Sequence, residues 1–332
     1  MSIKIAMAYF FKEHEKQVDL AKQLGATHVV ASVSGAGLSV DGDDRPWEWA
    51  RLSRTIKSYE ERGLTVSVIE GPTPLDRAKL DLPGKDQEIE VFQKFLGDLG
   101  RLGVRTVCYN WMPIVGWFRT EHNLESRGGA RVTAYRDRTA RELPLTEAGI
   151  VPAERMWNNL EYFLKAVVPY AEAAGVRLAI HPDDPPVPSL RGIARVLINR
   201  KAFQRVIDMV PSMYNGITMC QGSFAAMGEN IPELISAFGE QGKIFFAHFR
   251  DIRGTAYDFT ETFHDDGQTD MYECMKRYYK IGYDGCMRPD HVPAMAGEEN
   301  ENPGYSILGN LFAIGYMKGL MEAAGRECKG LA

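Results

Sequence analysis

The 332-residue chain has 39 basic and 44 acidic residues, and its net charge of −5 gives no basic surface suited to nucleic acid. No segment reaches the roughly eighteen consecutive apolar residues that cross a bilayer, and we expect no secretory signal because the first residues lack a cleavage site. Five cysteines without regular short spacing are typical of a reducing compartment. The composition therefore predicts a cytoplasmic protein that acts on small molecules, with no membrane or nucleic-acid partner.

Short β-rich runs alternate with longer segments of helical period along the whole chain. The predicted strands are residues 3–8, 27–32, 64–70, 104–110, 176–181, 216–220, 243–249 and 283–288. The predicted helices are residues 12–24, 46–62, 86–102, 153–174, 190–210, 231–240, 269–281 and 306–324. Several helices end at a glycine that directly precedes a strand, as at Gly103 and Gly175, which is typical of a helix C-terminus. Eight strands and eight helices predict an α/β fold, a (β/α)₈ TIM barrel formed as a single domain by residues 1–332.

Two connections are too long to be simple turns. The first, at about residues 111–152, follows the fourth strand and is rich in arginine, and the second, at about residues 250–269, follows the seventh. Both leave the face formed by the carboxyl ends of the strands, where barrel enzymes have their active sites. They are therefore interpreted as lids or substrate-binding loops, with mobile loops or oligomer contacts as the alternative.

Four potential metal ligands follow strands five to eight. They are His181, Cys220, His248 and Asp290. Consecutive strands of a barrel would bring these side chains to one side of its mouth and leave room for a substrate beside them. Two imidazoles, a thiolate and a carboxylate suit Zn²⁺, Mn²⁺ or Fe²⁺. The alternative for each residue alone is structural, as a packed cysteine or a capping aspartate.

Other polar residues lie at or beyond the strand ends. His291 follows a ligand directly and is a candidate general acid or base, or else a residue that orients Asp290. Tyr305 is a second candidate proton carrier, or a structural residue at a helix start. The candidate substrate-binding residues are Glu70, Asn110, Asp183, Arg250, His264 and Arg288.

Several blocks of sequence resemble the mannonate dehydratase family, which belongs to the xylose isomerase-like TIM-barrel superfamily. The blocks are RTVCYNWMPIVGWFRT at 105–120, VRLAIHPDDPP at 176–186, GITMCQGSFA at 216–225, IFFAHFRD at 244–251, TFHDDGQTDMYE at 262–273, MRPDH at 287–291 and NPGYS at 302–306. The resemblance implies a divalent metal, usually manganese with iron as the alternative, on the four ligands named above. It also implies acid–base roles for His291 and Tyr305.

The same resemblance implies a metal-dependent dehydratase of hexuronate catabolism, which converts D-mannonate to 2-keto-3-deoxy-D-gluconate by loss of the C2 proton and the C3 hydroxyl. One departure from the family pattern is a shortened segment after strand four, which leaves a different sugar acid as an alternative substrate. A second alternative is a β-eliminating lyase, isomerase or epimerase of the same superfamily, and a third is a sugar-binding barrel without activity. A homodimer is expected because barrels of this superfamily often pair.

Overall fold

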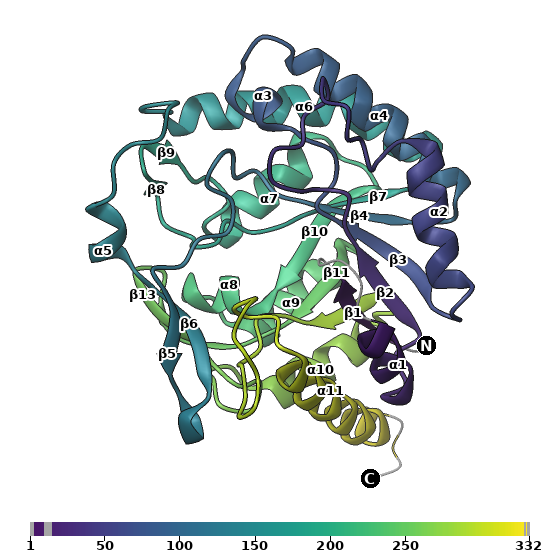
Figure 1. Ribbon diagram of the computed structural model, residues 1–332, viewed down its shortest axis with the longest axis vertical. Helices are drawn as coiled ribbons and strands as arrows, with labels where there is room; N and C mark the ends of the chain where they lie inside the picture. The colour runs from purple at the N-terminus through teal and green to yellow at the C-terminus, as the bar shows by residue number, and fades with distance from the viewer. Residues whose placement is uncertain (1–2, 10–14, 329, 331–332) are drawn as a thin grey trace.

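Eight parallel strands close into a barrel in the computed structural model, which describes residues 3–9, 15–328 and 330 (Figure 1). Around the barrel the order is β1-β14-β11-β10-β7-β4-β3-β2. The strands are β1 (Lys4–Tyr9), β2 (His28–Ala31), β3 (Thr65–Glu70), β4 (Thr106–Tyr109), β7 (Arg177–Ile180), β10 (Asn215–Cys220), β11 (Ile244–Phe249) and β14 (Cys286–Pro289). Each corresponds to one of the eight predicted strands, so the prediction of a TIM barrel is confirmed.

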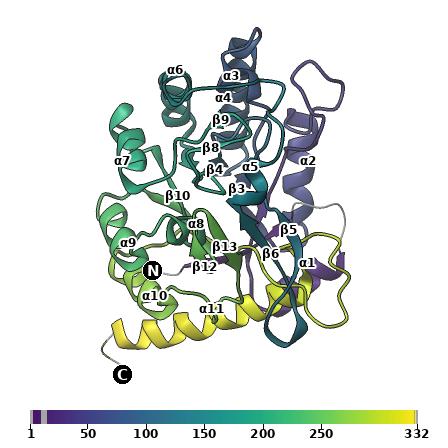
Figure 2. The ribbon, with the colours of Figure 1, turned by 90° about the vertical axis from the view of Figure 1, so that its left-hand side faces the viewer.

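Helices surround the barrel and cover the outer faces of its strands (Figures 1 and 2). They are α1 (Glu15–Gln23), α2 (Trp49–Glu60), α4 (Lys85–Arg101), α6 (Ala153–Ala174), α7 (Arg200–Met209), α9 (Ile231–Gly239), α10 (Met271–Lys280) and α11 (Ile307–Cys328). Gly175 ends α6 with a φ of 66°, as its place before a strand predicts. Shorter helices are α3 (Asp76–Leu80), α5 (Asp137–Arg141) and α8 (Gln221–Ala226). None of the helices in the described part of the chain has both the length and the apolar character needed to span a membrane.

One predicted helix, residues 190–210, is wrong in its first half. Residues there form a two-stranded hairpin of β8 (Ser189–Leu190) and β9 (Ile193–Ala194). Arg191 and Gly192 at its turn have φ values of 50° and 91°, which are incompatible with a right-handed helix. The helix begins only at α7, where the Asn199 side chain accepts a hydrogen bond from the amide of Ala202. Residues 12–14 of the first predicted helix lie outside the described residues.

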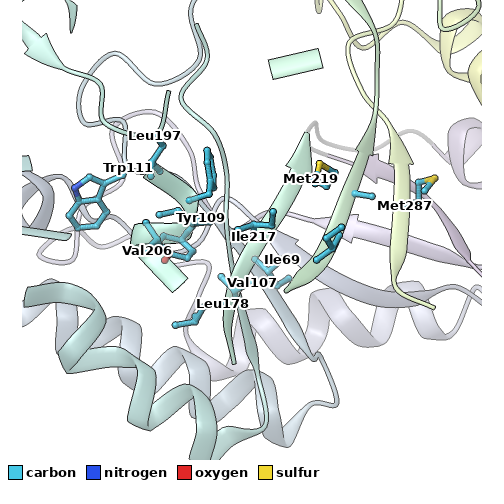
Figure 3. Close-up of a cluster of buried hydrophobic side chains, with 14 of the residues drawn as sticks. Ile69, Val107, Tyr109, Trp111, Leu178, Leu197, Val206, Ile217, Met219 and Met287 are labelled. Atoms are coloured by element: carbon cyan, nitrogen blue, oxygen red, sulfur yellow. The ribbon is translucent and has the colours of Figure 1, made fainter. Parts of the chain in front are cut away.

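Most barrel strands alternate between two apolar layers, and β11 departs from this alternation at Phe245, where its pairing with β10 is irregular. One buried cluster fills the interior with Ala6, Val30, Val68, Cys108, Ala179, Phe246 and Cys286, together with Phe245. The residues next to these along the strands belong to the larger outer cluster that packs under the helices, and Figure 3 shows part of it, including Ile69, Val107, Leu178, Ile217 and Met287. Because a strand has a period of two residues, this alternation fixes which later side chain of each strand points into the barrel.

The two long connections pair with each other in a second, antiparallel sheet. Its order is β12-β13-β6-β5, formed by β12 (Ile252–Thr255), β13 (Asp258–Glu261), β6 (Arg131–Arg136) and β5 (Glu121–Glu125). Phe259 of β13 lies opposite Tyr135 of β6, and both rings are buried with centroids 5.8 Å apart. In Figure 1 this accessory sheet stands at the left of the barrel. Sequence analysis predicted these segments only as loops, because a pairing between residues more than 120 positions apart leaves no local pattern.

Candidate active site

The side chains at the barrel mouth continue the interior positions of the strands. Two residues beyond Ala179, Thr218, Phe246 and Cys286 the chain reaches His181, Cys220, His248 and Arg288. Glu70 and Asn110 likewise lie two residues beyond the interior residues Val68 and Cys108. Asp290 lies two residues beyond Arg288. The strand register places Cys220 beside His248 and His248 beside Arg288. The four predicted ligands therefore lie at or just beyond the carboxyl ends of β7, β10, β11 and β14, which are neighbours in the barrel.

Three of the four predicted metal ligands, His181, Cys220 and His248, have donor atoms within 4.8 Å of one another, and Asp290 lies beside them. Nε2 of His181 lies 3.2 Å from Nδ1 of His248, and that Nδ1 lies 3.5 Å from Oδ2 of Asp290. Sγ of Cys220 lies 3.9 Å from the same carboxylate oxygen. Metal bonds of about 2.0–2.3 Å at roughly tetrahedral angles separate neighbouring ligand atoms by about 3.3–3.8 Å. The donor set and its spacing therefore fit a divalent metal.

Hydrogen bonds and charges prepare these ligands for a cation. Nδ1–H of His181 donates to the carbonyl of Pro182 at 2.7 Å, so Nε2 faces the other ligands with its lone pair. Burial alone would raise the pKa of the Cys220 thiol, but Arg250 and His181 lower that pKa well below its usual range. Burial likewise opposes ionisation of Asp290, and Arg288 outweighs it, so the pKa of this carboxyl is also well below its usual value. The protein thus offers a thiolate and a carboxylate, the anionic forms that bind metals.

A second group of donor atoms, formed by Glu70, Cys108 and His248, lies close by. Both oxygens of Glu70 accept hydrogen bonds of 2.9 Å from the guanidinium of Arg288. Burial raises the pKa of the Cys108 thiol well above its usual range, so this sulfur keeps its proton. Its Sγ also accepts a hydrogen bond from Thr218 inside the barrel. The group that includes Cys220 is therefore the better metal site.

His291 and Tyr305 lie on the other side of Asp290. Nε2 of His291 is 3.6 Å from Oδ1 of Asp290, and the Tyr305 hydroxyl donates to the same oxygen at 3.3 Å. The two rings meet edge to face with centroids 5.6 Å apart. His291 has a φ of 44°, a conformation that non-glycine residues rarely adopt and that active sites often contain. Burial raises the pKa of Tyr305 well above its usual value, so its phenol remains protonated.

Most of the predicted ligands and both predicted proton carriers border one cavity of about 110 Å³. His181, His248, Asp290, His291 and Tyr305 line it, and Cys220 is fully buried beneath them. The predicted substrate-binding residues Glu70, Asn110 and Arg288 also line this cavity.

The other three predicted substrate-binding residues do not reach the cavity wall. Asp183 accepts a hydrogen bond from the amide of Leu197 and lies 3.5 Å from Arg195. His264 is buried with its Nε2 2.6 Å from the carbonyl of Phe249, and burial lowers its pKa to about 4. Arg250 lies behind Cys220, with Nη1 3.4 Å from the sulfur. Each has a structural partner that accounts for its burial.

Four further residues surround the site, and none of them is among the residues to which the sequence assigned a role. Trp117 lines the cavity and meets the His291 ring edge to face at 5.1 Å. Arg119, Asp184 and Glu261 form a buried charged network beside it. Trp117 and Arg119 belong to the block at 105–120, so that block could have indicated them. Glu261 has no comparable signal, because only the accessory sheet brings it to the barrel mouth.

Comparison with known families gives a consistent result. The family model described as D-mannonate dehydratase (UxuA) matches residues 3–147 and 140–330. The mannonate dehydratase of Thermotoga maritima is 36% identical over 318 residues, which cover 85% of this chain and 88% of that protein. Mannonate dehydratase 2 of Halalkalibacterium halodurans is 32% identical and covers 97% and 99% of the two chains.

Solved structures give the same relationship in three dimensions. The crystal structure of mannonate dehydratase from Streptococcus suis serotype 2 superposes with a TM-score of 0.89 at 30% identity, covering 98% of this chain and 95% of that one. A D-tagatose 3-epimerase-like protein has a TM-score of 0.66 at 14% identity, covering 98% and 100% of the two chains. The second likeness shows the shared barrel fold alone.

Proposed function

Because this chain belongs to the D-mannonate dehydratase family, we propose that it removes water from D-mannonate and releases 2-keto-3-deoxy-D-gluconate. One observation supports the proposal beyond the likeness: His181, His248 and Asp290 line one cavity together with His291 and Tyr305, and Cys220 is buried beside Asp290. A dehydratase of this kind needs a site for positive charge, a proton acceptor and a proton donor. The cavity offers all three within a few ångströms of Asp290.

The difficult step is the loss of the C2 proton, because a proton beside an ionised carboxylate is very weakly acidic. A divalent metal on His181, Cys220, His248 and Asp290 would supply positive charge to the substrate oxygens and stabilise the developing enediolate. Arg288 adds a buried guanidinium to the same wall, held by Glu70 and Asp290. Positive charge in a water-poor cavity stabilises the anion more strongly than it would in water.

We assign the two proton transfers to His291 and Tyr305. Tyr305 keeps its proton because burial raises the pKa of the phenol well above its usual range. This supports Tyr305 as the donor that protonates the departing C3 hydroxyl. His291 then accepts the C2 proton at its Nε2, which is the ring nitrogen nearer Asp290. Glu70, Asn110 and Arg288 are proposed to contact the substrate, since all three line the cavity.

The proposed metal is Mn²⁺, with Fe²⁺ as the alternative. A carboxylate and two imidazoles suit both ions, and the thiolate of Cys220 suits Fe²⁺ and Zn²⁺ as well. Removal of metal with a chelator, followed by separate additions of Mn²⁺, Fe²⁺ and Zn²⁺, would identify the ion that restores turnover. Full activity in the chelated protein would contradict the proposal of a metal-dependent reaction.

The substrate is tested by a screen. Protein freed of metal and reloaded with Mn²⁺ is incubated with D-mannonate and with a panel of other aldonic and uronic acids, and formation of 2-keto-3-deoxy acid is measured. Product from D-mannonate at the highest kcat/KM is the expected result. Formation of product from a different acid alone would correct the proposed substrate, and the proposed dehydration reaction would stand. Interconversion of sugars without loss of water would contradict the dehydratase proposal and favour an epimerase.

We further propose a cytoplasmic location, one domain over residues 1–332 and a homodimer. All five cysteines are free thiols, and four are buried, which supports a reducing compartment. The accessory sheet consists of insertions in two βα connections of the barrel, which supports a single domain. Light scattering of the purified protein would measure its mass in solution, and a value near 37.2 kDa would contradict the dimer.

A further inference from the structure

A closed ring of four buried charges stands behind the proton carriers. Arg119 binds Asp184 through two hydrogen bonds of 2.6 and 3.0 Å, and Arg250 binds the same carboxylate at 2.8 Å. On the other side both guanidinium groups approach Oε1 of Glu261 at 2.6 Å, and Arg250 also donates to Oε2 at 2.9 Å. None of the four side chains is more than 2% exposed. Two positive and two negative charges therefore balance one another out of contact with solvent.

The ring touches His291 at one atom. Oε1 of Glu261 lies 3.0 Å from Nδ1 of His291, and Nη2 of Arg119 lies 3.4 Å from the same nitrogen. Nη2 has two hydrogens, and Asp184 and Glu261 accept them at 3.0 and 2.6 Å. No hydrogen of Nη2 is left for Nδ1. A carboxylate oxygen and a bare nitrogen 3.0 Å apart would repel each other, so Nδ1 must carry the hydrogen that it shares with Glu261.

We propose that Glu261 is a positioning residue for the proton transfer: it fixes His291 as the Nδ1–H tautomer and turns the Nε2 lone pair to the cavity. The inference rests on the proposed function for its catalytic meaning, because it explains how His291 is ready to accept the C2 proton. A carboxylate that holds an imidazole in one tautomer and one orientation is a known catalytic arrangement. Glu261 itself does not line the cavity, so it acts through His291.

Arg119 and Arg250 hold the Glu261 carboxylate in the position from which it orients His291. Their four hydrogen bonds immobilise both carboxylate oxygens, so the acceptor for Nδ1 is held in place before a substrate arrives. On the other side of the imidazole, the Trp117 ring lies 5.1 Å away and restricts its rotation. The Arg119 guanidinium lies over the Trp117 ring at 4.9 Å, so the indole is held by the same group.

The accessory sheet gains a role from this arrangement. Arg119 lies two residues before the start of β5, Arg250 lies two residues before the start of β12, and Glu261 is the last residue of β13. Pairing of β13 with β6 brings the two long connections together, and the ring of charges closes beneath them. The sheet therefore holds the partner of the acid–base histidine, whereas the proposed metal ligands lie on or just beyond the strands of the barrel itself.

A double-mutant cycle tests the inference. We expect Glu261→Gln to lower kcat by about 10–100-fold, the usual cost of losing the partner of a functional histidine. KM should change by less than about threefold and the metal content should stay the same, since the substitution leaves the cavity wall intact. In the His291→Asn background the same substitution should change kcat by less than about twofold, because the two residues act as one unit. Independent, multiplying losses would overturn the proposal, as would an unchanged kcat in Glu261→Gln.

Two further variants separate this effect from damage to the fold. Glu261→Asp keeps the charge of the ring but shortens the side chain by one methylene. If Glu261→Gln does not fold, Glu261→Asp takes its place in the test, and we expect the same loss of kcat. Asp258→Asn is the matched control on the same strand, because the Asp258 side chain is 72% exposed and pairs with Arg136 on the sheet surface. We expect its kcat to equal that of the unmodified protein. A similar loss in Asp258→Asn would mean that any disturbance of the sheet has this effect, which would overturn a specific role for Glu261.

Nitrogen NMR reads the tautomer without any turnover. The protein is labelled with ¹⁵N-histidine, loaded with diamagnetic Zn²⁺ and studied at alkaline pH. The His291 signals are identified by their absence from the His291→Asn variant. Protonated Nδ1 and unprotonated Nε2 are expected, and the reverse would overturn the proposal. If none of the sugar acids is dehydrated, the proposed function fails, whereas this spectrum still decides whether Glu261 sets the tautomer.

Discussion

The two sides of the cavity are built by different parts of the molecule. The proposed metal ligands are side chains at or just beyond the ends of β7, β10, β11 and β14, which are neighbours in the barrel. His291 stands one residue past this pattern, with a φ of 44°, and its Nδ1 contacts Glu261 from the accessory sheet. The metal side therefore inherits its geometry from regular strands, whereas the acid–base side depends on two insertions that pair across the mouth.

Loss of a metal ligand should have the largest effect. We expect the His181→Ala variant to bind little metal and its turnover to be lower by more than about 10³-fold. The ion would stabilise the charge that develops in the transition state by several kcal/mol, and each step of about 1.4 kcal/mol corresponds to a tenfold change in rate. The melting transition without metal should remain cooperative, since His181 is at the mouth and half-buried. Metal analysis after dialysis measures the first effect. Retention of one tightly bound ion per chain would contradict the assignment of this ligand.

Substitution of His291 should lower turnover without loss of metal, and so distinguish the two sides of the cavity. In His291→Asn we expect metal content equal to that of the unmodified protein, because the ring lies beyond Asp290 and outside the ligand cluster. Turnover should fall by about 10²–10⁴-fold, the usual contribution of a positioned acid or base. Elemental analysis and steady-state kinetics on one preparation give both values. Parallel loss of metal and activity would instead make His291 a residue that orients Asp290.

This division also explains what could be predicted from the sequence. His181, Cys220 and His248 continue interior positions such as Ala179, Thr218 and Phe246, so a period of two along each strand is enough to bring them together. Glu70, Asn110 and Arg288 reach the cavity by the same rule. Asp183, one position off this alternation, turns to Leu197 and Arg195 instead, although its residue type and strand-end location suited a substrate contact.

The remaining features depend on long-range pairing, which no local pattern encodes. Glu261 lies in a short strand with one charged residue at each end, DFTE, and nothing in that segment predicts a contact with a histidine thirty residues later. Arg250 and His264 were chosen from a segment that leaves the catalytic face, yet both are buried by partners behind the cavity. The hairpin in place of the first half of helix 190–210 likewise depends on a turn at Arg191 and Gly192 whose backbone a helical period cannot reveal.

A third variant tests the cost of the charged ring itself. Arg119→Met would leave two buried carboxylates, Asp184 and Glu261, to share the single guanidinium of Arg250, and we expect the free energy of unfolding to fall by about 3–5 kcal/mol. Asp258→Asn on the same sheet should lower it by less than about 1 kcal/mol, because that ion pair is exposed to solvent. Denaturant titration of metal-free protein measures both. Equal losses of unfolding free energy in the two variants would show that the exposed ion pair of Asp258 stabilises the protein as much as the buried ring does.

The smallest effect is expected inside the barrel, at Cys108. This thiol lies two residues before Asn110 on β4, and Thr218 donates to its sulfur at 3.2 Å. Cys108→Ala should lower the free energy of unfolding by about 1 kcal/mol, since it removes one buried sulfur and Thr218 keeps its hydrogen bond to the carbonyl of Ala179. Metal content and kcat should stay unchanged, whereas Cys220→Ala should lose metal. Loss of metal in Cys108→Ala would instead assign the ion to Glu70, Cys108 and His248. That outcome would place the metal one layer deeper in the barrel and break the division between ligands at the mouth and packing residues below them.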